Sequence, residues 1–546
     1  MRSADLIVKC LEAHGIERVY CVPGESYLAL LDALYDSAIK VIICRHESGA
    51  GFMAIAEARL TGKPAVFLVS RGPGATNGSI AVHVAEQDAT PVLVFIGQVS
   101  RTERGRGAFQ EVDYGQFFGG MAKAVYEIHD GSKIGETVTR SLRLASEGKP
   151  GPVIISLPED VLSDEAGGTV PAPFPLAVAH HGASDIAAIQ AMIDEASTPI
   201  VVAGAMLRGT KGAAALQRFA EALRIPVAVT WKNQDIFDND SPLYAGHLGF
   251  GNPPKHRQVL ANADLIIAVG TRLGDVASLN YTFPTAPEPK QKLIHIYPDG
   301  EPIGKVFRTD LGLVADPAAV LTDLASHPRV VSSARESWRS SINEFVRGFQ
   351  RFTSPEPNDA VDFGKVVVSI AEQAPANAVI TTDAGNMSTW VHRHWVMTPK
   401  NTLLGAIAGA MGFGVPTAVA AAIIDGTRMA ITFVGDGGVL MTGQELATAV
   451  QYGAKPKIVI SDNGIYGTIR THQERHYPHR VSGTDLANPD FTLWAKSFGV
   501  FASTITLGDD IDAKVKAFLE HDSAAVLHVK SSKEALSAFT TLSALN

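Results

Sequence analysis

The chain has 546 residues and a formal net charge of −9, so it lacks the basic balance that general nucleic-acid binding requires. Hydrophobic residues make up 46% and charged residues 19%, which is typical of a globular protein divided into roughly three or four domains. The three cysteines, Cys10, Cys21 and Cys44, form no CxxC pair. This argues against a disulfide framework or a zinc site and favours a reducing, cytoplasmic location.

Two proline-rich stretches, residues 170–175 and 354–358, have the composition of linkers. They predict three domains, at residues 1–170, 185–335 and 355–546. In each domain short apolar runs alternate with helical patterns, which predicts parallel sheets with helices on both faces. The expected fold class is therefore α/β, with three doubly wound parallel-sheet domains.

The predicted elements follow this division along the chain. The first domain has predicted strands at residues 41–44, 65–69 and 92–96, and the middle domain has them at 199–203, 226–230, 263–270 and 292–296, with a helix at 213–223. The last domain opens with a strand from residue 378. Its uncharged stretch 403–424 is long enough to cross a bilayer. The glycines and Pro416 within it favour a buried loop and helix instead, and we expect no membrane span.

The last domain also carries a spaced pair of motifs, Gly435-Asp436-Gly437 and Asp462-Asn463. Asp436 and Asn463 are 463 − 436 = 27 positions apart, and each follows a short apolar run. Between them, Thr442 and Glu445 have the spacing of a capping box, which predicts a helix start. The unit places a carboxylate and an amide oxygen at the ends of neighbouring parallel strands, where open α/β sheets bind ligands. Such oxygens suit a magnesium ion that carries a diphosphate.

Three blocks of the first domain accompany this pair: residues 45–50 around Glu47, residues 70–77, and residues 109–111. In this order, and together with the diphosphate motif, they resemble the thiamine-diphosphate enzymes of the acetolactate-synthase-like branch. The resemblance covers nearly the whole chain. It implies a pyrimidine-binding domain, a central Rossmann-like domain and a diphosphate-binding domain.

The resemblance also implies roles for individual residues. Glu47 matches the glutamate that hydrogen-bonds the aminopyrimidine ring, whereas a lone glutamate at this place would serve only the helix N-terminus. Met411 matches the apolar wedge that bends the cofactor, and the carbonyl of Gly409 matches the acceptor of its exocyclic amine. Gln110 matches a donor to substrate, with a surface amide as the alternative. These four residues are the catalytic candidates.

The cofactor and metal ligands are implied in the same way. The metal ligands are Asp436, the side chain of Asn463 and the backbone oxygen of Ile465. The expected cofactor-binding residues are Pro73, Asn77, Gly385, Asn386, Met387, Gly409, Met411, Gly435, Asp436, Gly437, Gly438, Asn463 and Ile465. Family members often have Ser or Ala where this chain has Gly438, so a side-chain contact is missing there.

Other departures concern the substrate and the central domain. His472 falls where acetolactate synthases carry a tryptophan, so Arg470 and His472 predict an acceptor with a carboxylate or phosphate, or else form a charged surface loop. Arg71 and Phe109 are further substrate candidates, although Arg71 also suits a structural ion pair. In the central domain, residues 250–251 and Tyr297 depart from the flavin-binding pattern. They argue against FAD, which the resemblance otherwise allows.

The implied activity is decarboxylation of a 2-oxo acid such as pyruvate, with transfer of the resulting enamine to an acceptor carbonyl. An alternative is a lyase or decarboxylase of 2-hydroxyacyl or oxalyl-CoA thioesters, for which Lys530 and Lys533 are suggestive. A non-catalytic pseudoenzyme is a third reading, and intact Glu47, Asp436 and Asn463 speak against it. The family places the cofactor between two chains, which implies a homodimer or homotetramer.

Overall fold

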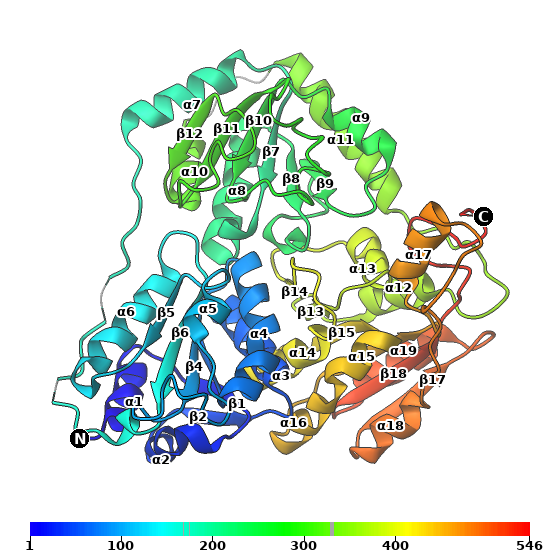
Figure 1. Ribbon diagram of the computed structural model, residues 1–546. Coiled ribbons are helices and arrows are strands. Elements are labelled where there is room, and N and C mark those ends of the chain that lie inside the picture. Colours follow the sequence, from blue (N-terminus) through cyan, green and yellow to red (C-terminus); the bar gives the residue numbers. More distant parts are fainter. Residues whose placement is uncertain (168, 174, 328–331, 546) are drawn as a thin grey trace.

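The computed structural model describes residues 1–546 except 168, 174, 328–331 and 546. Within these residues lie three six-stranded sheets, and every strand pair in them is parallel. The first and last domains lie side by side, and the central domain sits above both (Figure 1). The predicted fold class, three doubly wound parallel-sheet domains, is confirmed.

The first sheet has the strand order β2-β1-β3-β4-β6-β5. Its strands are β1 (Arg18–Cys21), β2 (Lys40–Ile43), β3 (Ala65–Val69), β4 (Val92–Gln98), β5 (Ala124–Glu127) and β6 (Pro152–Pro158). Its helices are α1 (Ser3–Ala13), α2 (Leu28–Tyr35), α3 (Glu47–Thr61), α4 (Gly72–Gln87), α5 (Tyr114–Phe118) and α6 (Ile134–Ser146). The inner strands β3 and β4 are buried along their whole length, as strands covered on both faces should be.

The central sheet has the order β12-β11-β10-β7-β8-β9 and a hydrophobic core of its own. Its strands are β7 (Pro199–Ala203), β8 (Val227–Thr230), β9 (Tyr244–Leu248), β10 (Leu265–Val269), β11 (Lys292–Tyr297) and β12 (Leu311–Val314). Its helices are α7 (Ala183–Glu195), α8 (Thr210–Leu223), α9 (Pro254–Leu260), α10 (Pro317–Ala325) and α11 (Ser333–Gln350).

The last sheet repeats the strand order of the first, as β14-β13-β15-β16-β18-β17. Its strands are β13 (Val379–Thr382), β14 (Thr402–Gly405), β15 (Ala430–Gly435), β16 (Lys457–Asp462), β17 (Phe501–Ile505) and β18 (Ala525–Lys530). Its helices are α12 (Phe363–Gln373), α13 (Ser388–His394), α14 (Gly414–Ile424), α15 (Asp436–Thr442), the 3₁₀ turn η6 (Gly443–Glu445), α16 (Leu446–Gln451), α17 (Gly467–His476), α18 (Phe491–Ser497) and α19 (Ile511–Glu520).

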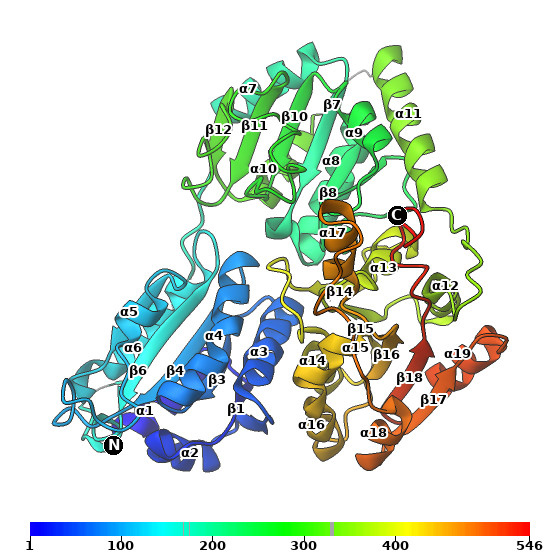
Figure 2. The ribbon, with the colours of Figure 1, turned by 45° about the vertical axis from the view of Figure 1, so that its right-hand side comes forward.

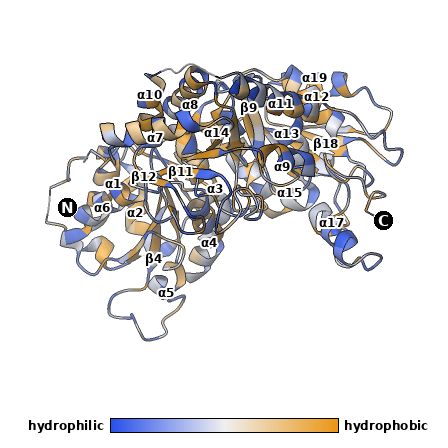
Figure 3. Cartoon of the chain, turned by 90° about the horizontal axis from the view of Figure 1, so that it is seen from above, coloured by the Kyte–Doolittle hydropathy of each residue, from blue (hydrophilic) through white to orange (hydrophobic). Residues whose placement is uncertain are grey.

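One apolar core joins the first and last domains. Helix α3 packs against α14, and the rings of Phe52 and Phe413 meet edge to face with their centroids 5.3 Å apart. The C-terminal tail returns to α13, where Arg393 donates to the carbonyl of Ala538, and it lies beside α13 in both ribbon views (Figure 2). Helix α17 stands out as a hydrophilic helix at the rim (Figure 3).

Two sequence expectations need correction. The helical turn η6 starts after Thr442 as predicted, but the capping box is wrong, because the Thr442 hydroxyl donates to the carbonyl of Gly412 and Glu445 is fully buried. The stretch 403–424 contains most of strand β14 ahead of its loop and helix. The predicted linker 170–175 includes Phe174, which lies outside the described residues. No helix in the described part of the chain has the length and apolar character needed to span a membrane.

Candidate active site

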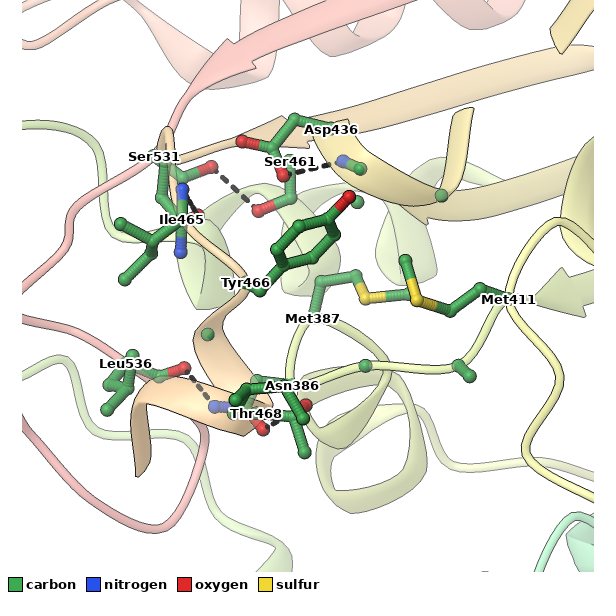
Figure 4. A pocket seen from close by; sticks show the side chains of 18 of the residues that line it. Asn386, Met387, Met411, Asp436, Ser461, Ile465, Tyr466, Thr468, Ser531 and Leu536 are labelled. Atoms are coloured by element: carbon green, nitrogen blue, oxygen red, sulfur yellow. Dashed lines mark hydrogen bonds between the residues drawn. The ribbon is translucent and has the colours of Figure 1, made fainter. Parts of the chain in front are cut away.

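A pocket of about 240 Å³ lies at the carboxyl end of the last sheet. All of its described lining residues belong to the last domain, from loops that follow β13, β14, β15 and β16 and from the C-terminal tail (Figure 4). Strand order reverses between β13 and β15, the position where open α/β sheets bind ligands. The predicted site residues that line it are Gly385, Asn386, Met387, Gly409, Met411, Gly435, Asp436, Gly437, Gly438, Asn463 and Ile465.

Asp436 is a buried carboxylate held in place by three donors. Its Oδ2 accepts from the backbone N–H of Gly464 and from Nδ2 of Asn488, both at 2.8 Å. Its Oδ1 accepts from the N–H of Gly437 at 2.8 Å. Burial raises the pKa of Asp436, and a cation beside this carboxylate would favour its charged form. With the amide oxygen of Asn463 beside it, the site has the hard oxygen donors that a magnesium ion prefers.

The glycines around Asp436 are required by close neighbours. A Cβ on Gly437 would lie 2.5 Å from the ring of Tyr466. A Cβ on Gly438 would lie 2.2 Å from Oδ2 of Asp383. The departure at Gly438 therefore has a physical reason, because a buried carboxylate occupies the space that a side chain would need. The bare backbone of this turn leaves room for a diphosphate to approach.

A second source of backbone donors is α17, whose first residues Gly467 and Thr468 line the pocket. The first N–H groups of a helix have no partner within the helix, and they favour phosphate oxygens. Together with the oxygen ligands, this arrangement fits a thiamine diphosphate tail carrying a divalent cation.

The loop between β14 and α14 places Gly409 and Met411 at the pocket. Gly409 has φ +70°, a backbone conformation that favours glycine. The thioether of Met411 faces that of Met387 across the pocket (Figure 4). Asp383 secures the end of the loop, because its carboxylate accepts from the N–H groups of Gly412 and Phe413 at 3.0 and 3.1 Å.

The same loop is held from the other two domains. Asp88 of the first domain, which is fully buried, accepts from the N–H of Ile407 at 2.7 Å. Lys232 of the central domain, also fully buried, donates to the carbonyl of Ala406 at 3.0 Å. Buried hydrogen bonds to charged groups are among the stronger ones. The wedge-bearing loop is thus anchored by side chains from all three domains.

Glu47 lies in the first domain, at the first residue of α3, and is half-buried. Nδ2 of Asn77, on α4, donates to its Oε2 at 3.0 Å. Gly74 lies next to this carboxylate, since a Cβ there would be in van der Waals contact with Oε1 of Glu47 at 3.4 Å. Pro73 belongs to the first turn of α4. The structure therefore brings Glu47 and Asn77 together but leaves them outside the pocket of the same chain.

The remaining predicted residues fall in three places. Gln110 is half-buried with φ +63°, and its carbonyl accepts from the N–H of Gly72 at 3.1 Å. Phe109 beside it is 72% exposed, a large apolar side chain left uncovered in the single chain. Arg71 is buried against Glu159, as the ion-pair alternative describes.

On α17, the guanidinium of Arg470 donates to Glu474 at 2.8 Å, and this partner is buried. His472 is exposed and stacks on His476 with ring centroids 6.1 Å apart. Neither Arg470 nor His472 is among the described residues that line the pocket. In this conformation of α17 both belong to its charged outer surface.

Models of three thiamine pyrophosphate enzyme domains match the chain: the N-terminal TPP binding domain at residues 1–117, the central domain at 186–324, and the C-terminal TPP binding domain at 383–529. A probable acetolactate synthase large subunit of Methanocaldococcus jannaschii is 33% identical, over 94% of this chain and 89% of that protein. The acetolactate synthase isozyme 2 large subunit of Escherichia coli is 30% identical, over 97% and 95%.

The chain belongs to the thiamine pyrophosphate enzyme family. The predicted resemblance to its acetolactate-synthase-like branch is confirmed, and with it a thiamine-diphosphate-dependent carboligase or decarboxylase activity. The match to the N-terminal TPP binding domain includes Glu47, and the match to the C-terminal TPP binding domain includes Asp436. The two matches therefore cover the two halves of the site described above.

Sequence reasoning missed several parts of this thiamine pyrophosphate site. Unpredicted lining residues include Trp390, Ser461, Tyr466, Thr468, Ser531 and Leu536. The amide of Asn386 holds two of them, since its Oδ1 accepts from Thr468 at 2.9 Å and its Nδ2 donates to the carbonyl of Leu536 at 3.1 Å. Asn488, which bridges Asp436 and Asp462, was missed as well. These residues lie outside any spaced motif.

The resemblance places any FAD in the central domain. Here the carboxyl ends of β7, β8, β10 and β11 surround a cavity of about 110 Å³. Trp231 at its wall is buried, and its ring meets that of Phe250 edge to face at 5.0 Å. Ligand pockets usually have about 300–1,000 Å³. This cavity is smaller than that, but so is the 240 Å³ pocket of the last domain, so the expectation against FAD stays a prediction.

Proposed function

We propose that the chain decarboxylates a 2-oxo acid such as pyruvate and joins the remaining acyl unit to an acceptor carbonyl, as the names of its acetolactate synthase relatives suggest. The observation that carries the proposal is the pocket of the last domain. It gathers Asp436, Asn463 and the loop of Gly409 and Met411 at one sheet edge. We propose no flavin for this reaction.

Magnesium would be held by Asp436, Asn463 and the backbone oxygen of Ile465, and thiamine diphosphate would supply a carbon nucleophile and an electron sink. The chain supplies orientation and a dry environment. Met411 and Met387 offer apolar walls, and the Gly409 carbonyl offers an acceptor beside them. The anchored loop keeps these groups in place without reorganisation during the reaction.

Glu47 would hold a proton at the pyrimidine ring, with Asn77 fixing the direction of its carboxylate. Because Glu47 lies outside the pocket of its own chain, we propose a dimer in which it reaches the pocket of the partner subunit. The exposed Phe109 fits a surface that the partner covers. A tetramer built from two such dimers is compatible with the same contact.

The coenzyme A thioester alternative has weaker support. Its suggested basic contact, Lys530, donates to Oδ2 of Asp462 at 2.7 Å. This pairing with a residue of β16 occupies one donor of a half-exposed ammonium group, which makes Lys530 a poorer candidate for a coenzyme phosphate contact. We therefore place the 2-oxo acid reaction first.

A Glu47→Gln variant tests the role of Glu47. We expect it to bind thiamine diphosphate and magnesium with near-normal affinity, measured by calorimetry, because the diphosphate ligands are in the other domain. Carbon dioxide release from pyruvate should fall by about 10²–10⁴-fold, since a proton-transfer group is lost. A Glu103→Gln variant, altered on an exposed turn, should behave as the wild type. Near-normal turnover of Glu47→Gln would refute the assignment.

A further inference from the structure

Glu445 is a fully buried acid that the proposed reaction does not use. It lies on the 3₁₀ turn η6 of the last domain, yet two of its three hydrogen-bond donors are in the first domain. Its Oε1 accepts from the backbone N–H groups of Arg45 and His46 at 2.9 and 3.0 Å. Its Oε2 accepts from the hydroxyl of Thr448 at 2.6 Å. The carboxylate therefore holds the two residues that immediately precede Glu47.

The segment after Glu445 holds the preceding strand as well. β2 is the edge strand of the first sheet, so one of its sides has no neighbouring strand. The hydroxyl of Tyr452 takes the place of a neighbouring strand. It accepts from the N–H of Ile43 at 2.8 Å and donates to the carbonyl of Val41 at 3.0 Å. The last domain thus follows the edge of β2 up to the turn that leads to Glu47.

Glu445 is closely packed against α3. Gly49 lies in the first turn of α3, and a Cβ on it would come within 2.3 Å of Oε1 of Glu445. His46 is the N-cap of α3, and its Nδ1 accepts from the N–H of Ser48 at 3.1 Å. Fixing the backbone of His46 therefore fixes where α3, and with it Glu47, begins.

The physical reason for using a carboxylate here is the pair of N–H groups. A buried N–H without an acceptor costs about 1–3 kcal/mol, so residues 45 and 46 need a partner in this non-helical turn. One anionic oxygen serves both donors, and hydrogen bonds in a water-poor interior are stronger than at the surface. No side chain of the first domain makes this contact among the described residues.

We propose that Glu445 is a positioning residue for Glu47, setting the direction in which that carboxylate leaves α3. The proposal rests on the proposed function. It has a consequence in the dimer, because α15 and η6 run without interruption from Asp436 to Glu445. One end of this segment belongs to the metal site of its own chain. The other end, Glu445, fixes the direction of the Glu47 carboxylate that would act in the partner's pocket. The segment therefore links two active sites.

Four proteins test the proposal: wild type, Glu445→Ala, Glu445→Gln and Tyr452→Phe. The amide oxygen of Glu445→Gln accepts the same two N–H groups, so this variant should behave nearly as the wild type. Tyr452→Phe is the matched control, because it removes two hydrogen bonds between the same domains without touching residues 45 and 46.

Amide hydrogen exchange in the protein without cofactor is the first readout. Glu445→Ala should raise exchange at residues 45–49, and Tyr452→Phe only near Ile43.

The second readout is exchange of the thiazolium proton of bound thiamine diphosphate for deuterium. Misplacement of a catalytic group by about 1 Å can cost 10²-fold, so Glu445→Ala should slow this exchange by about tenfold or more. Its affinity for the cofactor should change little, because the turn that it releases, at residues 45 and 46, belongs to the first domain and not to the diphosphate pocket. Tyr452→Phe and Glu445→Gln should stay within about threefold of the wild type.

Three results would overturn the proposal: unchanged thiazolium exchange in Glu445→Ala, an equal loss in Tyr452→Phe, or unchanged amide exchange at residues 45–49. An equal loss would mean that any weakening of the domain contact has the same effect. Wild-type protein that binds no thiamine diphosphate would refute the proposed function instead. The amide exchange pattern would then still report whether Glu445 holds the turn.

Discussion

At the scale of single residues, one neighbouring side chain explains why this chain has glycine at position 438, where family members often have Ser or Ala. Asp383 is fully buried, and burial raises its pKa to about 6. Its carboxylate accepts from the loop that carries Met411 and fills the space above Gly438. The absent side chain at position 438 and the anchored wedge loop are therefore two aspects of one packing arrangement.

We predict that Gly438→Ala destabilises the protein by about 1–3 kcal/mol, the usual cost of overpacking a close-packed site. Its Cβ would meet Oδ2 of Asp383, which cannot move without releasing the loop. Thermal unfolding of the cofactor-free protein measures the loss. Gly348→Ala is the control, because Gly348 lies on the exposed side of α11 with open space around it. There alanine should stabilise the helix by up to about 1 kcal/mol, and an unchanged midpoint for Gly438→Ala would contradict the packing argument.

The sequence predicted those residues whose roles depend on local spacing. Asp436 and Asn463 lie at the ends of adjacent strands, so their separation along the chain reports their proximity. Asn488 and Glu445 gave no such signal. Glu445 has the spacing of a capping-box residue, but its real partners, Arg45 and His46, are about 400 positions away in the chain. Contacts between domains leave no periodic trace in a sequence.

At the scale of elements, the predicted strands were found because they are short, apolar and buried on both faces. Runs such as 65–69 and 199–203 agree with β3 and β7 residue for residue. The irregular segments were harder to predict. The helix expected to start at Thr442 is a 3₁₀ turn, η6, followed by the short helix α16, and Glu445 accepts from the first domain instead of capping that helix.

The central domain contains histidines that the fold keeps neutral. His247 on β9 and His256 on α9 are both buried, and burial lowers the pKa of each to about 4. The imidazole of His256 lies between the carbonyl of Ala245 and the side chain of Asn252, each 3.0 Å away. In the unfolded chain these groups regain a pKa of about 6.5 and take up protons more readily.

This difference predicts a loss of stability in mild acid. Because the folded pKa lies below the unfolded one, the contribution is complete above about pH 6.5 and is lost as pH falls toward 4. Each histidine should lower the free energy of unfolding by about 1.4 kcal/mol per pH unit within that window. Thermal midpoints measured between pH 7 and pH 5 test this. His256→Gln should flatten the dependence, His83→Gln on an exposed position should not, and a pH-independent midpoint would contradict the account.

At the scale of the whole molecule, the first and last domains share a strand order and a continuous core, yet they contribute different halves of the site. Glu47 and Asn77 are not among the described residues that line the pocket of Asp436 and Asn463 in the same chain. The dimer that we propose would bring the two halves together. The sequence predicts which residues belong to the site, whereas the proposal of a second copy comes from the arrangement of the domains.

Complementation between two inactive variants tests this arrangement. Glu47→Gln and Asp436→Ala should each be inactive alone. The first lacks the group that holds the proton at the pyrimidine ring, and the second lacks a ligand of the metal. After mixing under conditions that exchange subunits, the mixed dimer has one site with both defects and one with neither. About a quarter of wild-type activity should return when the exchange is random. If both halves acted within one chain, every site would keep one defect and the mixture would stay inactive.

The pocket wall contributed by Ser531, Ser532, Ala535 and Leu536 follows β18 in the chain, after the loops that supply the rest of the pocket. Domains fold as they leave the ribosome, N-terminal parts first. The rest of the pocket is therefore synthesised before this wall and stays open on one side until the wall joins it. Capture of the vitamin should follow the arrival of this segment.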